Sequence, residues 1–366
     1  MHTRPIPWVL PIAQHSGAFA AIGYICSMRQ TVPALAIAAL TACGGSDDPG
    51  TDTALAPAAR SPAHIESPEP GIGFGASIAL HDGVLHVGAI GGPGAGRVYT
   101  ISDLGAPELA FQEEQFGALG ASMVSVGGSL YVAAPLTNDG AGAIWKDGEL
   151  WREGNEGEMV GRTLFALRGE LGLGTTEGLS VGEEVISGDA RATLAIAIGE
   201  KNVVGTPQGE ASVVIGEATL ARQSDGDWGG FSLCSADLSG DSIPELVVGA
   251  PASGQVHIYR TAGGDTSTPH LTLTGPDGRF GHTVACRDGE LVVGAPLHGE
   301  NFEGAIWIFN SDSGSFKEWS VGTPSFTGIA SEEQLGFSML LTNSGDLYVG
   351  GIGGVEGRGG LFAYTW

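Results

Sequence analysis

The chain has 366 residues, of which 62 are glycine and only 16% are charged, and its formal net charge is −25. Apolar residues make up 42% of the sequence, which is enough for a core and excludes a broadly disordered chain. A surface this acidic repels nucleic acid and anionic lipid, and it favours divalent cations and cationic partners, although solubility alone would also explain the charge.

The amino-terminal part of the chain has the features of a secretion signal. Residues 28–43 start with Met28 and Arg29, continue with an apolar run and end in "LTAC" at Cys43. This order resembles the lipobox of bacterial lipoproteins, in which the cysteine is lipidated and becomes the first mature residue. The resemblance implies the bacterial cell envelope, and Gly44 favours the outer membrane, on its periplasmic or its surface side. An ordinary signal peptide with a chance cysteine is the alternative.

Two segments flank this signal. Residues 1–27 have no place in it, so we expect Met28 to be the true start and the upstream part to be a mis-assigned extension. Residues 44–62 are small, polar and proline-bearing, which predicts a flexible linker that holds the remaining domain, residues 63–366, off the membrane.

The rest of the chain repeats one pattern seven times. Most copies have a glycine, any residue and a Ser or Thr anchor, then two apolar stretches joined by a tight turn, and they close near Gly-Ala. The anchors are Ser77, Ser122, Thr163, Thr193, Ser232, Thr283 and Ser338. Apolar alternation broken by pairs such as Asp-Gly predicts a β-hairpin, because glycine suits turns with positive φ.

Further runs in each copy supply a third and a fourth strand, and no stretch has a convincing helical period. Three or four antiparallel strands repeated seven times predict an all-β fold, a seven-bladed β-propeller whose blades stack around a ring. The last copy has no fourth strand after it. We therefore expect the segment around His64–Pro68 to close the ring with an amino-terminal strand.

Several copies resemble the FG-GAP repeats of the integrin α-subunit propeller. The phrases "GFGAS", "RFGHT" and "GGFSLCSADLSGDSIPELVVGAP" carry the resemblance, which extends over residues 71–366. It is specific in repeats 1, 2, 5, 6 and 7 and weaker in repeats 3 and 4, so a count of six blades is the alternative.

The fifth repeat carries an acidic insertion at its hairpin turn, where the distance from anchor to glycine is seventeen residues instead of about eleven. Hard cations such as calcium need six to eight oxygen ligands, which a short loop provides by aiming alternate groups inward. Here positions 1, 3, 5, 7 and 9 are Asp237, Ser239, Asp241, the Ile243 carbonyl and Glu245. This spacing matches the calcium loops of FG-GAP repeats and predicts one Ca²⁺ site. A solvated hairpin tip is the alternative.

The resemblance implies that this ion is structural and stiffens one rim of the disc. The opposite rim, made by the loops that join strands 2 to 3 and 4 to 1, is where the integrin-like family meets partners. The longest such loop here runs from 296 to 304, so His298, Asn301 and Phe302 are the candidate contacts.

Cys234 and Cys286 lie two and three residues after their anchors, in the inner strands of adjacent blades. An oxidising exterior permits a disulfide. Their one-residue offset points them to different faces of their strands, which favours two buried thiols, with the disulfide as the alternative.

No His-Glu-x-x-His or Gly-x-Ser-x-Gly motif occurs, so we expect no enzyme activity. The expected function is that of a membrane-anchored bacterial lipoprotein whose calcium-stabilised propeller binds a protein or glycan partner, and no nucleic acid. Two alternatives stay open, a carbohydrate-active enzyme with acids at the central channel and a structural component of an envelope assembly.

Overall fold

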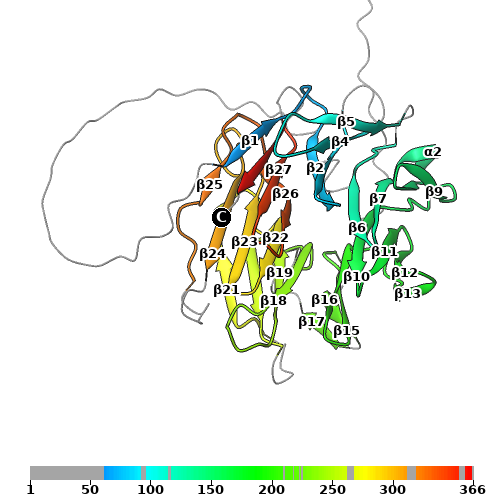
Figure 1. Ribbon diagram of the computed structural model, residues 1–366. Helices are drawn as coiled ribbons and strands as arrows, with labels where there is room; N and C mark the ends of the chain where they lie inside the picture. The colour runs from blue at the N-terminus through cyan, green and yellow to red at the C-terminus, as the bar shows by residue number, and fades with distance from the viewer. Residues whose placement is uncertain are drawn as a thin grey trace, which may run out of the picture.

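The structure, a computed structural model, describes residues 62–91, 96–113, 117–208, 211–216, 218–221, 223, 226–261, 268–310, 319–353 and 359–364. These residues form seven four-stranded antiparallel sheets, and the predicted seven-bladed β-propeller is thereby confirmed (Figure 1). Between β7 and β8 of blade 2 they also form the short helix α2 (Thr137–Gly140). In this part of the chain, no helix has the length and apolar character that a membrane crossing requires.

The strands are numbered from the innermost to the outermost position of each blade. Blade 1 has β2 (Phe74–His81), β3 (Val84–Ala89), β4 (Arg97–Ile101) and β5 (Glu108–Gln112). Blade 2 has β6 (Ser122–Val126), β7 (Ser129–Ala134), β8 (Ala143–Lys146) and β9 (Glu149–Glu153). Blade 3 has β10 (Thr163–Leu167), β11 (Glu170–Thr175), β12 (Gly178–Val181) and β13 (Glu184–Ser187). Blade 4 has β14 (Leu194–Ile198), β15 (Lys201–Gly205), β16 (Ala211–Ile215) and β17 (Ala218–Ala221).

The remaining three blades follow the same order. Blade 5 has β18 (Ser232–Ala236), β19 (Glu245–Ala250), β20 (Gln255–Tyr259) and β21 (Leu271–Thr274). Blade 6 has β22 (Thr283–Arg287), β23 (Glu290–Ala295), β24 (Ala305–Asn310) and β25 (Phe326–Thr327). Blade 7 has β26 (Leu335–Leu341), β27 (Leu347–Gly351), β28 (Gly360–Tyr364) and, as its outer strand, β1 (Ala63–Glu66).

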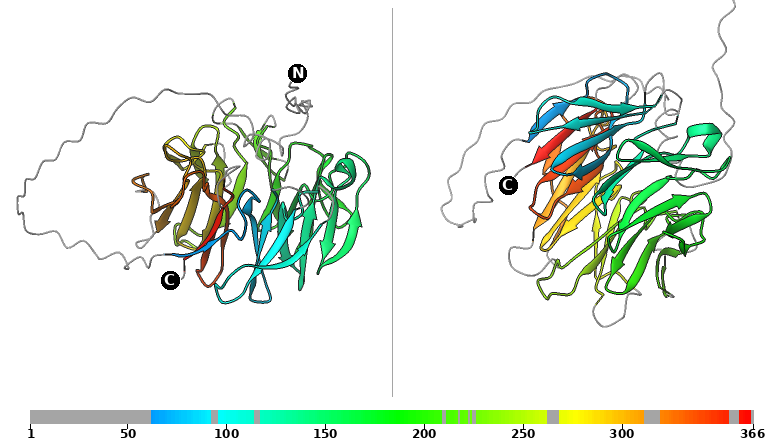
Figure 2. Two further views of the ribbon diagram at one scale, coloured as in Figure 1. Left: turned by 90° about the horizontal axis from the view of Figure 1, so that it is seen from above. Right: turned by 45° about the vertical axis from the view of Figure 1, so that its right-hand side comes forward.

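The ring closes with strands from both ends of the chain. Strand β1 pairs antiparallel with β28, with Ala63 opposite Ala363 and Glu66 opposite Gly360. Both views of Figure 2 show the blue β1 beside the red carboxy-terminal strands. The predicted closure by an amino-terminal strand is therefore confirmed, and it covers an edge of β28 that would otherwise be unpaired.

The hydrophobic core lies between the blades. Each of the seven buried clusters in the described residues takes side chains from two neighbouring blades. One such cluster joins Leu238 of blade 5 to Phe280 and Trp307 of blade 6, and another joins Leu361 of blade 7 to Phe74 of blade 1. Because blades bury their faces against each other, the ring stabilises itself as a whole.

The Ser and Thr anchors join each blade to the next by hydrogen bonds. The hydroxyl of Ser77 donates to the carbonyl oxygen of Gly120 at 2.6 Å, and Gly120 is the glycine two residues before the next anchor. Equivalent bonds run from Thr193 to Gly230, from Ser232 to Gly281, from Thr283 to Gly336 and from Ser338 to Gly75. The glycine and the anchor of the repeated motif are thus the two halves of one inter-blade contact.

The second glycine of the motif makes room for this contact. Gly88 lies opposite Ser77 across the hairpin, and a Cβ there would collide with the carbonyl oxygen of Gly120. Blade 2 has Ala133 at this position, and there Ser122 accepts a 2.9 Å bond from the Leu164 amide instead. The spacing of anchor and glycine in the sequence is therefore set by packing between blades.

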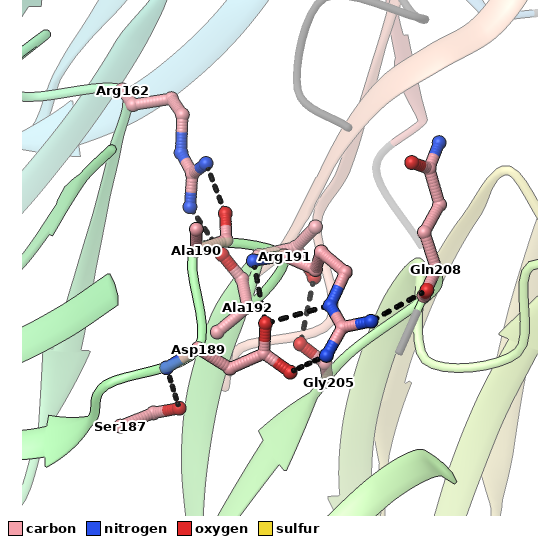
Figure 3. A network of polar contacts seen from close by, with 9 residues as sticks. Arg162, Ser187, Asp189, Ala190, Arg191, Ala192, Gly205 and Gln208 are labelled. Atoms are coloured by element: carbon pink, nitrogen blue, oxygen red, sulfur yellow. Dashed lines mark hydrogen bonds and ion pairs between the residues drawn. The ribbon is translucent and has the colours of Figure 1, made fainter. Parts of the chain in front are cut away.

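Blades 3 and 4 are joined by an arginine network, drawn in Figure 3. Arg162 donates 2.6 Å hydrogen bonds from its two terminal nitrogens to the carbonyl oxygens of Ala190 and Ala192. Arg191 forms a two-pronged ion pair with Asp189, and the hydrogen bond from Arg191 holds the pKa of Asp189 below its ordinary value. These charged contacts link the two blades whose repeats match the motif most weakly.

Cys234 and Cys286 form a disulfide, with Cα atoms 5.9 Å apart, so the preference for two free thiols was wrong. The error lay in comparing the two strands as if they belonged to one sheet. Ser232 faces blade 6, so Cys234, two residues later, also faces blade 6. Cys286 lies three residues after Thr283, which faces blade 7, and it therefore points back to blade 5. An odd offset is what brings two neighbouring blades into contact.

Candidate functional site

The acidic loop of blade 5 occupies the hairpin rim, the rim formed by the turns between strands 1 and 2 and strands 3 and 4 of each blade. Ala236 of β18 pairs with Glu245 of β19, and residues 237–244 connect them. In blade 6, two residues connect the equivalent pair, Arg287 and Glu290. The predicted six-residue insertion is therefore present at the hairpin tip.

The carboxylate of Asp237 organises the loop. Its oxygens accept hydrogen bonds from the amides of Gly240 at 2.7 Å, Asp241 at 3.2 Å and Ser242 at 2.7 Å. Desolvation alone would raise the pKa of Asp237, but these amide bonds outweigh it and lower the pKa below its ordinary value. Asp241 in turn accepts a 3.0 Å bond from the Ile243 amide, so the first and third acidic positions both shape the backbone.

The other two side chains of the predicted site lie beneath the loop. The carboxylate of Glu245 is buried and accepts bonds from the amides of Leu238 at 2.9 Å and Ser239 at 3.2 Å. Burial raises the pKa of Glu245 above its ordinary value, although the Leu238 amide opposes this. The hydroxyl oxygen of Ser239 is also buried, and it has no hydrogen-bond partner among the described residues.

These side chains fit a hard cation by chemistry, since all of them offer oxygen, and the unpartnered Ser239 hydroxyl is a ligand in reserve. As they stand, however, no three acidic, histidine or cysteine side chains of the described residues converge on one point. Glu245 is also not peculiar to the insertion, because Glu290 opens the same "ELVVGA" strand in blade 6. The acids that belong to the insertion itself are Asp237 and Asp241.

The acidic loop is tied to the next blade. The Asp237 amide donates to the Asp288 carboxylate at 3.1 Å, and the Gly289 amide donates to the Asp237 carbonyl at 2.8 Å. The Cys234–Cys286 disulfide crosses the same interface between β18 and β22. The loop is therefore held on both the strand side and the turn side.

On the opposite rim, which we call the loop rim, a pocket of about 790 Å³ lies between blades 5 and 6. His298 and Phe302 line it together with Arg279, whereas Asn301 does not. Phe302 is 46% exposed, while the His298 ring packs edge-on against Trp307 at 5.3 Å. Of the three predicted contacts, the structure thus brings two into one pocket.

Beside this pocket, four rings form a continuous aromatic row. Trp228 stacks on Phe231 at 6.1 Å between ring centres, Phe231 contacts His282 at 5.0 Å, and His282 contacts Phe337 at 5.1 Å. The guanidinium of Arg279 lies 4.5 Å from the centre of the Trp228 ring. Each of the four aromatic residues keeps part of its surface accessible.

The charge state of the aromatic row is set by its surroundings. Burial, followed by the positive charge of Arg279, lowers the pKa of His282 to about 4. The imidazole is therefore neutral at physiological pH, and the row presents uncharged ring faces.

The sequence analysis missed this row, although its signal was present. Phe231, His282 and Phe337 occupy the position between glycine and anchor in blades 5, 6 and 7. Blades 1, 2 and 4 have alanine at that position, as Ala76 and Ala121 illustrate. Reading this variable position down the seven repeats would have shown three rings on three consecutive blades.

Comparison with known proteins agrees with the fold and the motif. The model of the FG-GAP repeat matches residues 229–264, which include the acidic loop. Integrin alpha-5 of Xenopus laevis is 32% identical over 155 residues, which cover 34% of this chain and 15% of that protein. Phosphatidylinositol-glycan-specific phospholipase D of Bos taurus is 33% identical over 107 residues, which cover 22% of this chain and 13% of that protein. The chain thus spans a small part of either relative.

Among solved structures, the WD40 β-propeller domain of Doa1 superposes with a TM-score of 0.54 and 13% identity. The superposition covers 82% of this chain and 96% of that one. At this identity the similarity concerns the fold alone.

Proposed function

Because the chain is an FG-GAP-repeat β-propeller of the integrin-α-like kind, we propose that it is a lipid-anchored interaction scaffold that binds a protein partner through the loop rim of blades 5–7. Propellers of this kind are protein-interaction scaffolds in general. The specific surface, the anchor and the ion are the proposal.

The aromatic row beside the pocket is the observation that carries this proposal. Aromatic and arginine side chains dominate the energy of protein interfaces, and here Trp228, Phe231, Phe337 and Arg279 gather on one rim. Neutral ring faces attract cations, as the position of Arg279 over Trp228 illustrates. With a net charge of −25 on the chain, the partner that fits best presents a basic side chain to the row.

The proposed anchor is compatible with this arrangement. Ala63, at the start of β1, pairs with Ala363, near the hairpin-rim end of β28, so the chain enters the propeller on the rim opposite the aromatic row. A linker that precedes it and ends in a lipidated Cys43 would hold the hairpin rim toward the membrane and leave the loop rim accessible. Both segments lie outside the described residues. Labelling with a palmitate analogue tests the anchor, because Cys43→Ser should abolish incorporation.

We further propose that the acidic loop binds one Ca²⁺ through Asp237, Ser239, Asp241, the Ile243 carbonyl and Glu245. The bound ion would supply positive charge that holds these oxygens together and stiffens the hairpin. Calcium at one hundred times its dissociation constant should stabilise the fold by about 2.7 kcal/mol. Thermal unfolding with calcium and with chelator measures this. Asp241→Asn should abolish the difference and the control Asp82→Asn, in the plain turn of blade 1, should keep it.

Capture of a partner by the immobilised propeller tests the main proposal. Extracts of the cells that make the protein are passed over the wild type and over variants of either rim. Trp228→Ser or Phe337→Ser should reduce the captured partner at least about tenfold, because each removes a ring from the row. Ile243→Ser, which removes a 40% exposed side chain from the hairpin rim, should not. Equal capture by all variants would exclude the loop rim as the binding surface.

A further inference from the structure

A second recess lies on the hairpin rim, between blades 2 and 3, and has a volume of about 600 Å³. Trp151 and Arg152 of β9 line one side of it, and Glu170 of β11 lies on the other. Gly127 and Gly169 form parts of its wall, where a Cβ would meet no other atom within 4 Å. The recess is therefore open to ligands larger than an ion, and its volume lies in the range of about 300–1,000 Å³ that is common for ligand sites.

Trp151 is placed in this groove by a β-bulge. In the pairing of β8 with β9, Ile144 lies opposite Arg152 and Trp145 lies opposite Leu150, which leaves Trp151 as the extra residue. A bulge turns the side chain of the extra residue away from the regular alternation. Trp151 stays 47% exposed, and Tyr131 packs edge-on against it at 5.4 Å between ring centres, which fixes the orientation of the indole.

Blade 1 shows that this tryptophan is not needed for the fold. Strand β5 reads "ELAFQ" where β9 reads "ELWRE", and it carries the same bulge, with Ala110 as the extra residue. Ala110 thus corresponds to Trp151, and Phe111 corresponds to Arg152. The two residues that distinguish blade 2 from blade 1 at this place are the two that line the groove.

The groove combines a flat ring with hydrogen-bonding groups of both signs. The guanidinium of Arg152 lies 3.5 Å from the carboxylate of Glu158, which orients it and leaves donors on its other edge. Glu170 offers an exposed carboxylate across the groove. Because one cation and one anion line the groove, it does not select for a charged ligand, and the acidic chain as a whole repels anions.

We propose that this groove binds a neutral oligosaccharide. A pyranose ring has an apolar C–H face that stacks on an indole, and its edge carries hydroxyls that both donate and accept hydrogen bonds. Trp151 supplies the stacking surface, Arg152 the donors and Glu170 the acceptor. The groove is on the rim opposite the aromatic row, so the inference is independent of the proposed protein partner.

Isothermal titration with three neutral tetrasaccharides, cellotetraose, chitotetraose and maltotetraose, tests the inference. At least one of them should bind the wild-type protein. Trp151→Ala should weaken that binding at least about tenfold, and Arg152→Phe should also weaken it, although both changes restore the residues of blade 1. The control is Leu150→Ala, which removes a neighbouring exposed side chain that does not line the groove and should leave affinity unchanged.

Thermal unfolding of each variant confirms that the propeller stays folded, as the sequence of β5 predicts. The inference is overturned if none of the three tetrasaccharides binds at millimolar concentration. It is equally overturned if Trp151→Ala binds as tightly as the wild type, because the ligand would then lie elsewhere.

Discussion

The hydroxyl of Ser338 donates a 2.7 Å hydrogen bond to the carbonyl oxygen of Gly75, 263 residues away in the sequence. It is the same contact that joins Ser77 to Gly120 and Ser232 to Gly281, and it closes the ring between blade 7 and blade 1. The repeated glycine and anchor therefore act on the neighbouring blade.

Ring closure by β1 predicts that a short amino-terminal deletion destabilises the whole propeller. Deleting residues 60–70 removes β1 and leaves the edge of β28 unpaired. It also removes Ile65, which is buried between blades 7 and 1. We expect a clear fall in the unfolding temperature measured by circular dichroism. Deleting residues 44–57 instead should change nothing. An unaltered unfolding temperature after the first deletion would mean that β1 does not close the ring.

The close approach of blades at the second motif glycine predicts a strong position dependence for glycine-to-alanine changes. A Cβ at Gly249 would collide with the Gly281 carbonyl and the Ser232 hydroxyl. Gly249→Ala should therefore cost roughly 1–3 kcal/mol of unfolding free energy. Gly188 has no atom within 4 Å of a built Cβ, so Gly188→Ala should be nearly neutral in the same urea titration. Similar costs at the two positions would contradict the packing argument.

The Cys234–Cys286 disulfide predicts a dependence of stability on reductant. It joins positions 52 residues apart, and its loss should cost on the order of 2–4 kcal/mol. Urea unfolding with and without dithiothreitol measures this. The Cys234→Ser/Cys286→Ser protein provides the control, because reductant should have no further effect on it. Alkylation of both cysteines in denaturant without reductant would show that the bond does not form.

The lowered pKa of His282 predicts that the fold weakens on acidification. The unfolded chain takes up a proton near the ordinary value of 6.5, whereas the folded imidazole takes it up only near 4. Stability attributable to this residue is therefore complete above about pH 6.5 and falls as the pH drops toward 4. His282→Phe should flatten this part of the curve of urea midpoint against pH. It should fold normally, since Phe231 and Phe337 occupy the same position in the adjacent blades.

The fold was predictable because its signals are local and repeat. Turn glycines, alternating apolar residues and a fixed distance from anchor to glycine identify each hairpin, and seven copies identify the propeller. The placement of the acidic insertion followed from the regular length of its neighbours. By contrast, the disulfide depended on which faces of two different blades meet, and that required the direction of Ser232 toward blade 6.

The candidate surfaces were less predictable for the same reason. The aromatic row needs three blades to lie side by side before Phe231, His282 and Phe337 become neighbours. The exposure of Trp151 depends on a bulge, and the sequence "ELWRE" alone reads as an ordinary strand. Neither the link of Arg162 to blade 4 nor the bulge follows from periodicity.

Site-specific photo-crosslinking tests the proposed binding surface most directly. A photoreactive phenylalanine analogue is placed at Phe302, on the loop rim, or at Ile243, on the hairpin rim, and the protein is irradiated in its own cells. Both side chains are exposed, at 46% and 40%, so their reach into solvent is similar. We predict a discrete protein adduct from position 302 that position 243 does not give. The same adducts from both positions, or none from 302, would contradict binding through the loop rim.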